Sequence, residues 1–204
     1  MKISKIALAT LAFIAVSAGA TPQHQSGAHN AAGHDMANMQ SMHKSSPNAA
    51  KASYELQFID TMATHHQMAM HMASLVDTRS SSQHLKDMAK KMMADQEKEI
   101  AQLKGWREQW YAGKPEAVNM KMPGMSESMK GMTNNKLTSA NGEQFDRMFV
   151  EMMGQHHKGA IKMAQSAAPK FEHAELNEFA NKLVDMQKKE VAHLEEMKKS
   201  SAKK

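Results

Sequence analysis

The segment FIDTMATHHQMAMHMA, residues 58–73, decides the fold of this chain because it recurs without gaps as FVEMMGQHHKGAIKMA at residues 149–164. The residues identical in both copies are Phe58, Met62, His65, His66, Ala69, Met72 and Ala73, which recur as Phe149, Met153, His156, His157, Ala160, Met163 and Ala164. The same offset relates the following segments, where Leu85, Ala89, Gln96, Glu99 and Leu103 recur as Leu176, Ala180, Gln187, Glu190 and Leu194. The chain therefore contains two copies of one unit, and each copy comprises two consecutive segments.

Both segments of the unit have the residue spacing of amphipathic helices. Core-type residues step by four and three, as in the series Phe58, Met62, His65, Ala69, Met72 and Val76, which gives each helix one buried stripe. Ser80 to Ser82 interrupts the first pair of helices, Pro169 interrupts the second, and residues 141–144 are predicted to form a capping box. We therefore predict an all-α fold, a four-helix bundle made of two repeated helical hairpins, with helices at about 53–77, 82–112, 142–168 and 171–199.

Three other segments differ from these helices in composition. Residues 1–20 combine two lysines, an apolar run and the small residues Ala18-Gly19-Ala20, as in a cleaved secretory signal peptide. Residues 21–51 are polar and are predicted to be a disordered arm rich in Met and His, because they have little apolar surface to bury. Residues 113–140 are predicted to be a polar, Met-rich linker between the hairpins of a bundle at 52–199.

The chain is rich in methionine and histidine and lacks cysteine. It has 22 Met and 12 His among 204 residues, with no Cys. Thioethers and imidazoles are the ligands that remain for a soft metal ion outside the reducing cytosol when thiols are absent. The net charge of +5 and the 5% of aromatic residues give no support to nucleic-acid binding. No second long apolar run follows the first, so we also expect no membrane span.

One group of candidate ligands lies in the arm and the linker. A polar segment has no core for methionine to fill, so thioethers there are better explained as ligands for Cu(I) or Ag(I). Inside helices, methionine is more often a core residue than a ligand. The candidates of this group are Met36, Met39, Met42 and His43 in the arm and Met120, Met122 and Met125 in the linker.

A second group lies within the predicted helices. His65 and His156 fall on the core stripes, level with Gln96, Glu99, Gln187 and Glu190 on the facing helices. Because buried polar groups need partners, two interpretations stay open: structural His-to-Glu contacts, or a metal centre. His66 and His157 are expected about 100° from the core stripe, and Met62, His66 and Met70 would form a ladder along that flank. The candidates of this group are Met62, His65, His66, Met70, His71, Met72, Met153, His156, His157 and Met163.

The two copies of Met-x-x-His-His, each followed by a helix with Gln-x-x-Glu, resemble a ferritin-like bacterial family called domain of unknown function three hundred and five. The resemblance covers roughly Tyr54 to Lys198, including Trp106, Trp110 and the Met-Pro-Gly-Met sequence at 122–125. It implies a ferritin-like four-helix bundle and, for the copper-binding members, Cu(I) and Ag(I) sites made by Met and His. Residues 156–161 agree with the family pattern, whereas the first copy departs from it by adding methionine.

These observations favour a metal-binding function without catalysis. We expect a periplasmic protein that binds, buffers or transfers Cu(I), with Ag(I) as its mimic, and contributes to copper homeostasis and resistance. Its partners would be soft metal ions and a periplasmic copper transporter or chaperone. Two alternatives remain: a metal-dependent oxidoreductase with a His/Glu centre inside the bundle, and a structural bundle without metal.

Overall fold

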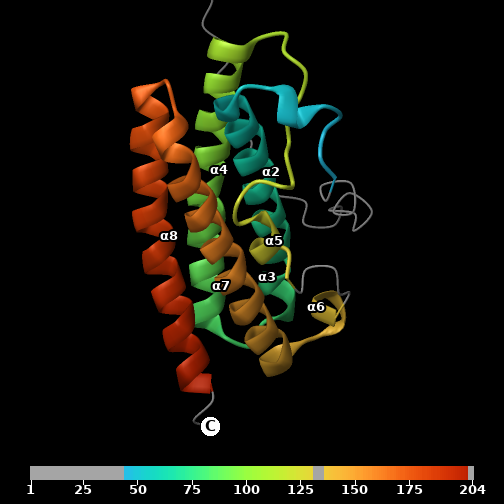
Figure 1. Ribbon diagram of the computed structural model, residues 1–204. Coiled ribbons are helices and arrows are strands. Elements are labelled where there is room, and N and C mark those ends of the chain that lie inside the picture. Colours follow the sequence, from blue (N-terminus) through green and yellow to red (C-terminus); the bar gives the residue numbers. More distant parts are fainter. Residues whose placement is uncertain (1–43, 131–135, 202–204) are drawn as a thin grey trace, which may run out of the picture. The chain divides into compact units, whose positions relative to one another are not determined.

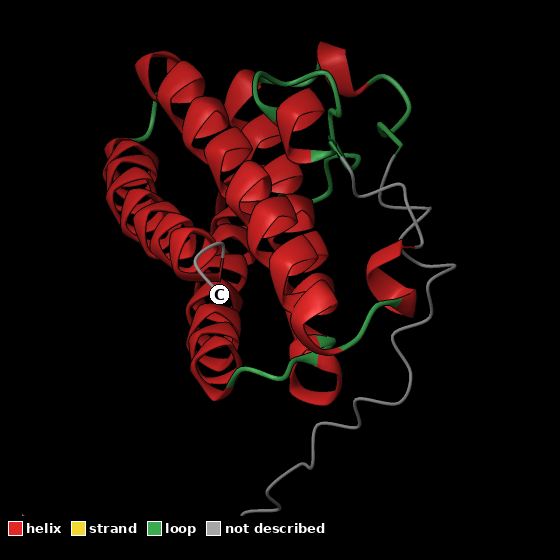
Figure 2. Ribbon diagram, turned by 90° about the horizontal axis from the view of Figure 1, so that it is seen from below, coloured by secondary structure: helices red, strands yellow, loops and turns green. Residues whose placement is uncertain are grey.

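The described part of the chain is helical. The computed structural model describes residues 44–130 and 136–201, and these ranges contain no strand (Figure 1, Figure 2), which confirms the predicted all-α class. The predicted signal peptide and the candidates Met36, Met39, Met42 and His43 lie outside the described residues. In chain order the elements are η1 (Ala49–Lys51), α2 (Tyr54–Ser74), α3 (Val76–Arg79), α4 (Gln83–Tyr111), α5 (Met125–Ser128), α6 (Lys136–Ser139), α7 (Gly142–Ala167), η2 (Ala168–Lys170) and α8 (Ala174–Ser201).

The four long helices pair in chain order. Helix α2 packs against α4, and α7 packs against α8, while α2 and α7 join the two pairs (Figure 1). Helices α4 and α8 pack less closely than any of these pairs. Each pair carries one copy of the repeat, so the two His-His sequences lie on the neighbouring helices α2 and α7. Within the described residues, no helix is both long enough and apolar enough to cross a membrane.

Two apolar clusters fill the space between the helices, and a layer of polar residues lies between them in each long helix. The first cluster includes Phe58, Met62, Leu103, Met163 and Leu183. The second includes Met72, Leu85, Met92, Phe149 and Leu194. Burying this surface stabilises the fold by about 25 cal/mol for each Å² removed from water. The polar positions of the repeat are therefore held between two packed regions.

Side-chain hydrogen bonds cap the N-termini of α2 and α4 but not that of α7. Ser53 Oγ accepts a hydrogen bond from Leu56 N at 3.4 Å, and Ser82 Oγ accepts one from Leu85 N at 3.2 Å. Asn141 occupies the N-cap position of α7 but makes no side-chain cap hydrogen bond. The predicted capping box is therefore wrong. The Asn141 side chain instead lies 3.5 Å from Nη1 of Arg79, which also contacts the preceding backbone carbonyl.

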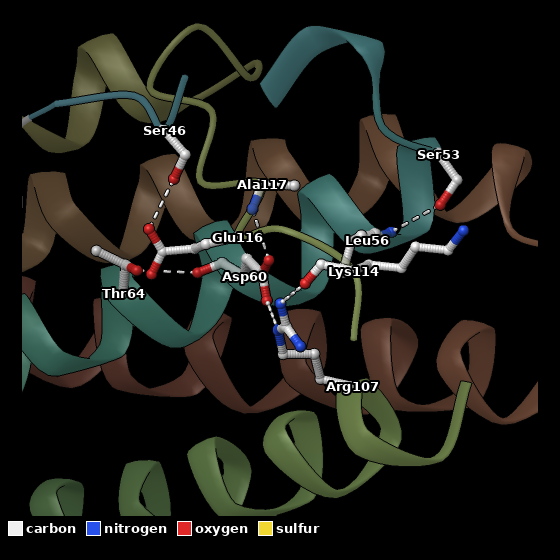
Figure 3. A network of polar contacts seen from close by, with 9 residues as sticks. All are labelled: Ser46, Ser53, Leu56, Asp60, Thr64, Arg107, Lys114, Glu116 and Ala117. Carbon is white, nitrogen blue, oxygen red and sulfur yellow. Dashed lines mark hydrogen bonds and ion pairs between the residues drawn. The ribbon is translucent and has the colours of Figure 1, made fainter. Parts of the chain in front are cut away.

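The segment after α4 folds back onto α2. The buried carboxylate of Asp60 accepts hydrogen bonds from Ala117 N at 2.7 Å and from Arg107 Nε at 3.0 Å (Figure 3). The next residue of α2, Thr61, accepts a hydrogen bond at Oγ1 from Asn119 N at 2.8 Å. Helix α2 thus supplies side-chain partners for backbone groups that would otherwise be buried without water.

This folding back corrects one premise about the linker methionines. Met122 and Met125 are 3% and 1% exposed and belong to the apolar cluster around Phe58. The expectation that methionine has no core to fill in this segment is wrong for these two residues. Met120 is partly buried and packs against both clusters. A role in metal binding stays a prediction for all three residues.

Two glycines allow α5 to lie close to α7. Gly124 has a φ of +93°, and a Cβ there would stand 2.1 Å from the carbonyl oxygen of Gly159. A Cβ on Gly159 would stand 1.7 Å from Ser128 Oγ. Any larger residue at either position would collide with its neighbour. The close approach places Ser128, at the end of α5, over the polar layer.

Residues just before α2 also belong to the folded part. Ser46 N donates to the carbonyl oxygen of Val118 at 2.8 Å, and Ser46 Oγ donates to Glu116 at 2.7 Å (Figure 3). Ser45 Oγ accepts a hydrogen bond from Met120 N at 3.0 Å. Composition predicts a disordered arm that includes residues 44–51. They are ordered here because the returning segment offers them hydrogen-bond partners.

Candidate functional site

The candidate site is the polar layer of the repeat, buried at mid-height between the two apolar clusters. His65 and His66 of α2 and His156 and His157 of α7 are all 0% exposed. Helices α4 and α8 complete the layer with the buried side chains of Gln96, Glu99 and Gln187 and the partly buried Glu190. Every member comes from a position that the two halves of the chain share, so the layer has the twofold repetition of the sequence.

His65 and His156 lie at the centre of this layer. Their ring centroids are 3.7 Å apart, with the planes tilted by 34°. His65 Nε2 lies 2.8 Å from Ser128 Oγ, which itself lies 3.0 Å from the carbonyl oxygen of Gly124 and 3.2 Å from that of His156. Since the hydroxyl donates its single proton to a carbonyl, its oxygen accepts from Nε2–H of His65. This tautomer leaves a lone pair on Nδ1 of His65.

The neighbouring histidines contact the carboxylates. His66 Nε2 lies 2.7 Å from Glu99 Oε2, and His157 Nε2 lies 2.9 Å from Glu190 Oε2. These are ion-pair distances without hydrogen-bond alignment, since the Nε2 atoms of His66 and His157 have no aligned hydrogen-bond partner among the described residues. His66 and His157 are expected on the flanks of their helices, about 100° from the core stripe, and both are fully buried there. The facing helices α4 and α8 cover the sides of α2 and α7 that carry them, so the buried face is wider than one stripe.

Burial keeps the two central histidines neutral. Loss of solvent lowers the pKa of His65 well below its ordinary value, and the nearby His66 and His157 lower it further. Burial also lowers the pKa of His156 well below its ordinary value, with additional contributions from His65 and His157. Neutral imidazole is the form that binds metal ions, because protonation occupies the ring nitrogen lone pair.

Several polar atoms of the layer have no hydrogen-bond partner within the described residues. Among them are Nδ1 of His65, both ring nitrogens of His156, both amide atoms of Gln96 and Oε1 of Gln187. A buried polar atom left unpaired costs about 1–3 kcal/mol, and such atoms are uncommon in folded proteins. The cluster therefore has free donor and acceptor atoms through which it could bind a metal ion or water.

Buried methionines accompany these histidines. Met62 and Met153, each three residues before a His-His pair, are fully buried in different apolar clusters. Met72 and Met163 are also buried, whereas Met70 is only partly buried. His71 is buried but lies beyond the layer, beside the second cluster. The ladder of Met62, His66 and Met70 stays a prediction, with its first two members fully buried.

Sequence reasoning missed Ser128, which joins the linker to His65. Its signal was weak: one serine in a polar segment, three residues after the Met-Pro-Gly-Met sequence. The sequence also gives no sign that Gly124 and Gly159 approach each other closely. Among the described residues, no group of three or more His, Cys, Asp or Glu side chains is arranged to hold a metal ion by itself. Sulfur ligands would have to complete a site in the layer.

Comparison with known families identifies the class of protein to which this chain belongs. Residues 55–198 match the family described as Domain of unknown function (DUF305), and the chain therefore belongs to this family. DUF305 structures from Streptomyces coelicolor and Deinococcus radiodurans have the same fold, each with 23% identity and a TM-score of 0.63. They cover 74% and 73% of this chain, and the matches span 94% and 97% of theirs. The resemblance stated from the His-His motifs is confirmed.

The chain is also similar to CopM. The Cu(I)-bound form of CopM is 27% identical, with a TM-score of 0.59, and the match covers 72% of this chain and 96% of CopM. The Cu(II)-bound form is 26% identical, with a TM-score of 0.58 and coverage of 72% and 97%. An Ag-bound form obtained by co-crystallization is 27% identical, with a TM-score of 0.59 and coverage of 72% and 96%. No protein with a curated description matches this sequence.

Proposed function

We propose that this protein binds Cu(I) and Ag(I) in the periplasm, as a buffer or carrier that contributes to copper homeostasis and resistance. The observation that carries the proposal is the buried layer, where neutral imidazole nitrogens without partners occur three residues from the fully buried thioethers of Met62 and Met153. The similarity to CopM, which has been solved with Cu(I), Cu(II) and silver, supports the choice of metal. Copper is the cargo of the protein in this proposal.

The donor set suits a soft monovalent ion. Nδ1 of His65 and the ring nitrogens of His156 supply imidazole donors, and Met62 and Met153 supply thioethers from the same helices. Thioether ligands favour Cu(I) and Ag(I) over Zn²⁺, Mg²⁺ and Ca²⁺. One thioether is a modest ligand, so we expect two or three donors for each ion. Met72, Met163 and His71 are further candidates in the helices.

The remaining parts of the proposal concern architecture and location. We propose that the four long helices form a ferritin-like four-helix bundle and that residues 1–20 are a signal peptide removed on export. The methionines of the arm, Met36, Met39 and Met42, together with His43, would supply additional soft donors. A periplasmic copper transporter or chaperone would receive the ion from this protein.

We propose binding rather than catalysis. The chain contains one Glu-x-x-His sequence, Glu190-Val191-Ala192-His193, whereas a carboxylate-bridged two-metal centre uses two such sequences pointing inward. Here the two side chains diverge: Glu190 contacts the buried His157, while His193 contacts His84 at the surface. This arrangement disfavours the oxidoreductase alternative. The purely structural layer is the remaining rival.

Titration with Cu(I) in competition with a chromogenic chelator tests the proposal. The chain from Thr21 onward should bind at least one Cu(I), and replacing Met62 and Met153 together by Leu should weaken the bundle site about tenfold or more. Met92→Leu is the matched control, because Met92 is also buried but lies on α4, which carries no His-His pair. Leu conserves volume, so all variants should fold. Uptake below one equivalent, or equal affinity of the pair and the control, would rule out the proposal.

A second measurement separates the arm from the bundle. Replacing Met36, Met39 and Met42 by Leu should remove only the ions that the arm binds and leave the bundle site intact. Growth on copper with and without the gene then tests the physiological role. A structural protein without metal predicts unchanged copper tolerance.

A further inference from the structure

We propose a second metal site, formed by His84 and His193 at the surface, for a divalent cation that prefers imidazole ligands, with Cu(II) as the best match. His84 lies in the first turn of α4, and His193 lies in the second half of α8. Their Nε2 atoms are 2.7 Å apart, and their ring centroids are 4.8 Å apart with the planes at 50°. The two nitrogens thus converge on one point at the protein surface.

The distance between the two nitrogens favours a particular coordination geometry. Imidazole nitrogens bind such metals at about 2.0–2.1 Å, so two of them at neighbouring corners of a square plane are about 2.8–3.0 Å apart. Tetrahedral coordination would separate them by about 3.3–3.4 Å. The observed 2.7 Å is a hydrogen-bond distance, and the rings would move less to reach the square-planar or tetragonal arrangement that Cu(II) and Ni(II) adopt than the tetrahedral arrangement of Zn²⁺.

The position of the pair gives binding a structural consequence. Helices α4 and α8 belong to different hairpins and pack less closely than the other neighbouring long helices. His84 is exposed and His193 is partly exposed, so solvent water can complete the coordination of an ion. A hydrogen bond between two such rings contributes little in competition with water. An ion held by one ligand from each hairpin would instead tie α4 to α8 and stabilise the folded state.

This site is separate from the soft-metal layer proposed above. The internal repeat pairs His84 with Glu175 and His193 with Gln102, so neither histidine is a repeated residue of the layer. Its donors are imidazoles, which suit borderline divalent cations, whereas the layer adds thioethers for monovalent ions. The two proposals can therefore fail independently.

Cu(II) titration of the chain from Thr21 onward tests the site, with electron paramagnetic resonance and thermal unfolding as readouts. The wild type should bind one more Cu(II) than His84→Gln, His193→Gln or the double variant. Each single variant should lose as much as the double variant, because the two rings form one site. Saturating Cu(II) should raise the Tm of the wild type by several degrees more than that of the variants.

The controls separate this pair from the histidines of the arm. His29→Gln removes an arm histidine and should retain the full metal-induced rise in Tm, since the proposed ligands are His84 and His193. Both histidines of the pair are at the surface, so circular dichroism without metal should show unchanged folding. Equal Cu(II) stoichiometry and equal rise in Tm for the wild type and the double variant would overturn the proposal. Unchanged Cu(I) uptake by the double variant would show that the soft-metal layer is intact in either outcome.

Discussion

The imidazole ring of His65 lies 3.7 Å, centroid to centroid, from that of His156. Each ring occupies the same position in its copy of the repeat, and the copies lie on the neighbouring helices α2 and α7. Two protonated rings at this distance would repel each other strongly in a site without water. This repulsion disfavours protonation of both rings together, and burial, which lowers both pKa values, disfavours protonation of either ring.

Acid should destabilise the protein through this pair. Burial lowers the pKa of His65 and of His156 in the folded state, whereas in the unfolded chain both titrate near pH 6.5. Below pH 6.5, the unfolded state therefore binds protons that the folded state does not bind. This contribution to stability is complete above pH 6.5 and is lost as the pH falls below it. Below pH 6.5, each histidine should lower the free energy of unfolding by about 1.4 kcal/mol per pH unit.

Urea unfolding of the metal-free protein between pH 7.5 and pH 5 measures this effect. His84→Gln combined with His193→Gln is a control that removes two surface histidines and should leave the steep fall of the free energy of unfolding in place. A flat profile from pH 7 to pH 5 would contradict the neutral state of the central pair.

Gly159→Ala should destabilise the contact between α5 and α7. The added Cβ would lie 1.7 Å from Ser128 Oγ and 2.5 Å from the carbonyl oxygen of Gly124, and relieving such a collision costs about 1–3 kcal/mol. Gly154→Ala in the same helix is the matched control, because its Cβ meets nothing within 4 Å. Alanine there should stabilise α7 by up to about 1 kcal/mol. Thermal unfolding should show opposite signs, and equal effects would contradict the close approach.

Ser128→Ala should destabilise the protein by leaving Nε2 of His65 without its partner. The expected loss is about 1–3 kcal/mol, since the ring nitrogen remains buried. Ser126→Ala, at an exposed position of the same short helix, should change stability by less than about 0.5 kcal/mol. Nitrogen chemical shifts of the histidine rings provide a second readout. They should show that His65 changes tautomer in Ser128→Ala alone, and an unchanged spectrum would argue against the proposed hydrogen bond.

Asp60→Asn should release the segment that follows α4. Burial raises the pKa of Asp60, while the backbone N–H of Ala117 and the guanidinium of Arg107 oppose this rise. Asn has no charge to pair with Arg107 and only one acceptor oxygen in place of two, so we expect the free energy of unfolding to fall by about 3 kcal/mol. Asp95→Asn breaks exposed ion pairs with Lys91 and Lys98 and should cost less than about 1 kcal/mol.

Limited proteolysis distinguishes a local from a global effect of Asp60→Asn. Cleavage should concentrate between residues 112 and 124, because Arg107 and Ala117 no longer share the Asp60 carboxylate as their partner. If the variant were cleaved at the same sites and rates as the wild type, Asp60 would not be the anchor of this segment.

The amino-acid sequence alone determined the helical hairpins and the height of the polar layer. The spacing of residues such as Phe58, Met62 and Ala69 is a local property, because a helix turns by a constant angle per residue. The repeat then carries the same stripe and the same His-His pair to α7. The helical class and the family were predictable for this reason.

Only the tertiary structure decided which atoms meet in the layer and what covers it. The angle between His65 and His66 around α2 is local, but whether the second ring is buried depends on how α4 packs against α2, and α4 brings Glu99 to it. The burial of Met122 likewise depends on the folding back of its segment onto Asp60 and Thr61 of α2. These contacts join residues far apart in the chain, so no periodicity within one segment encodes them.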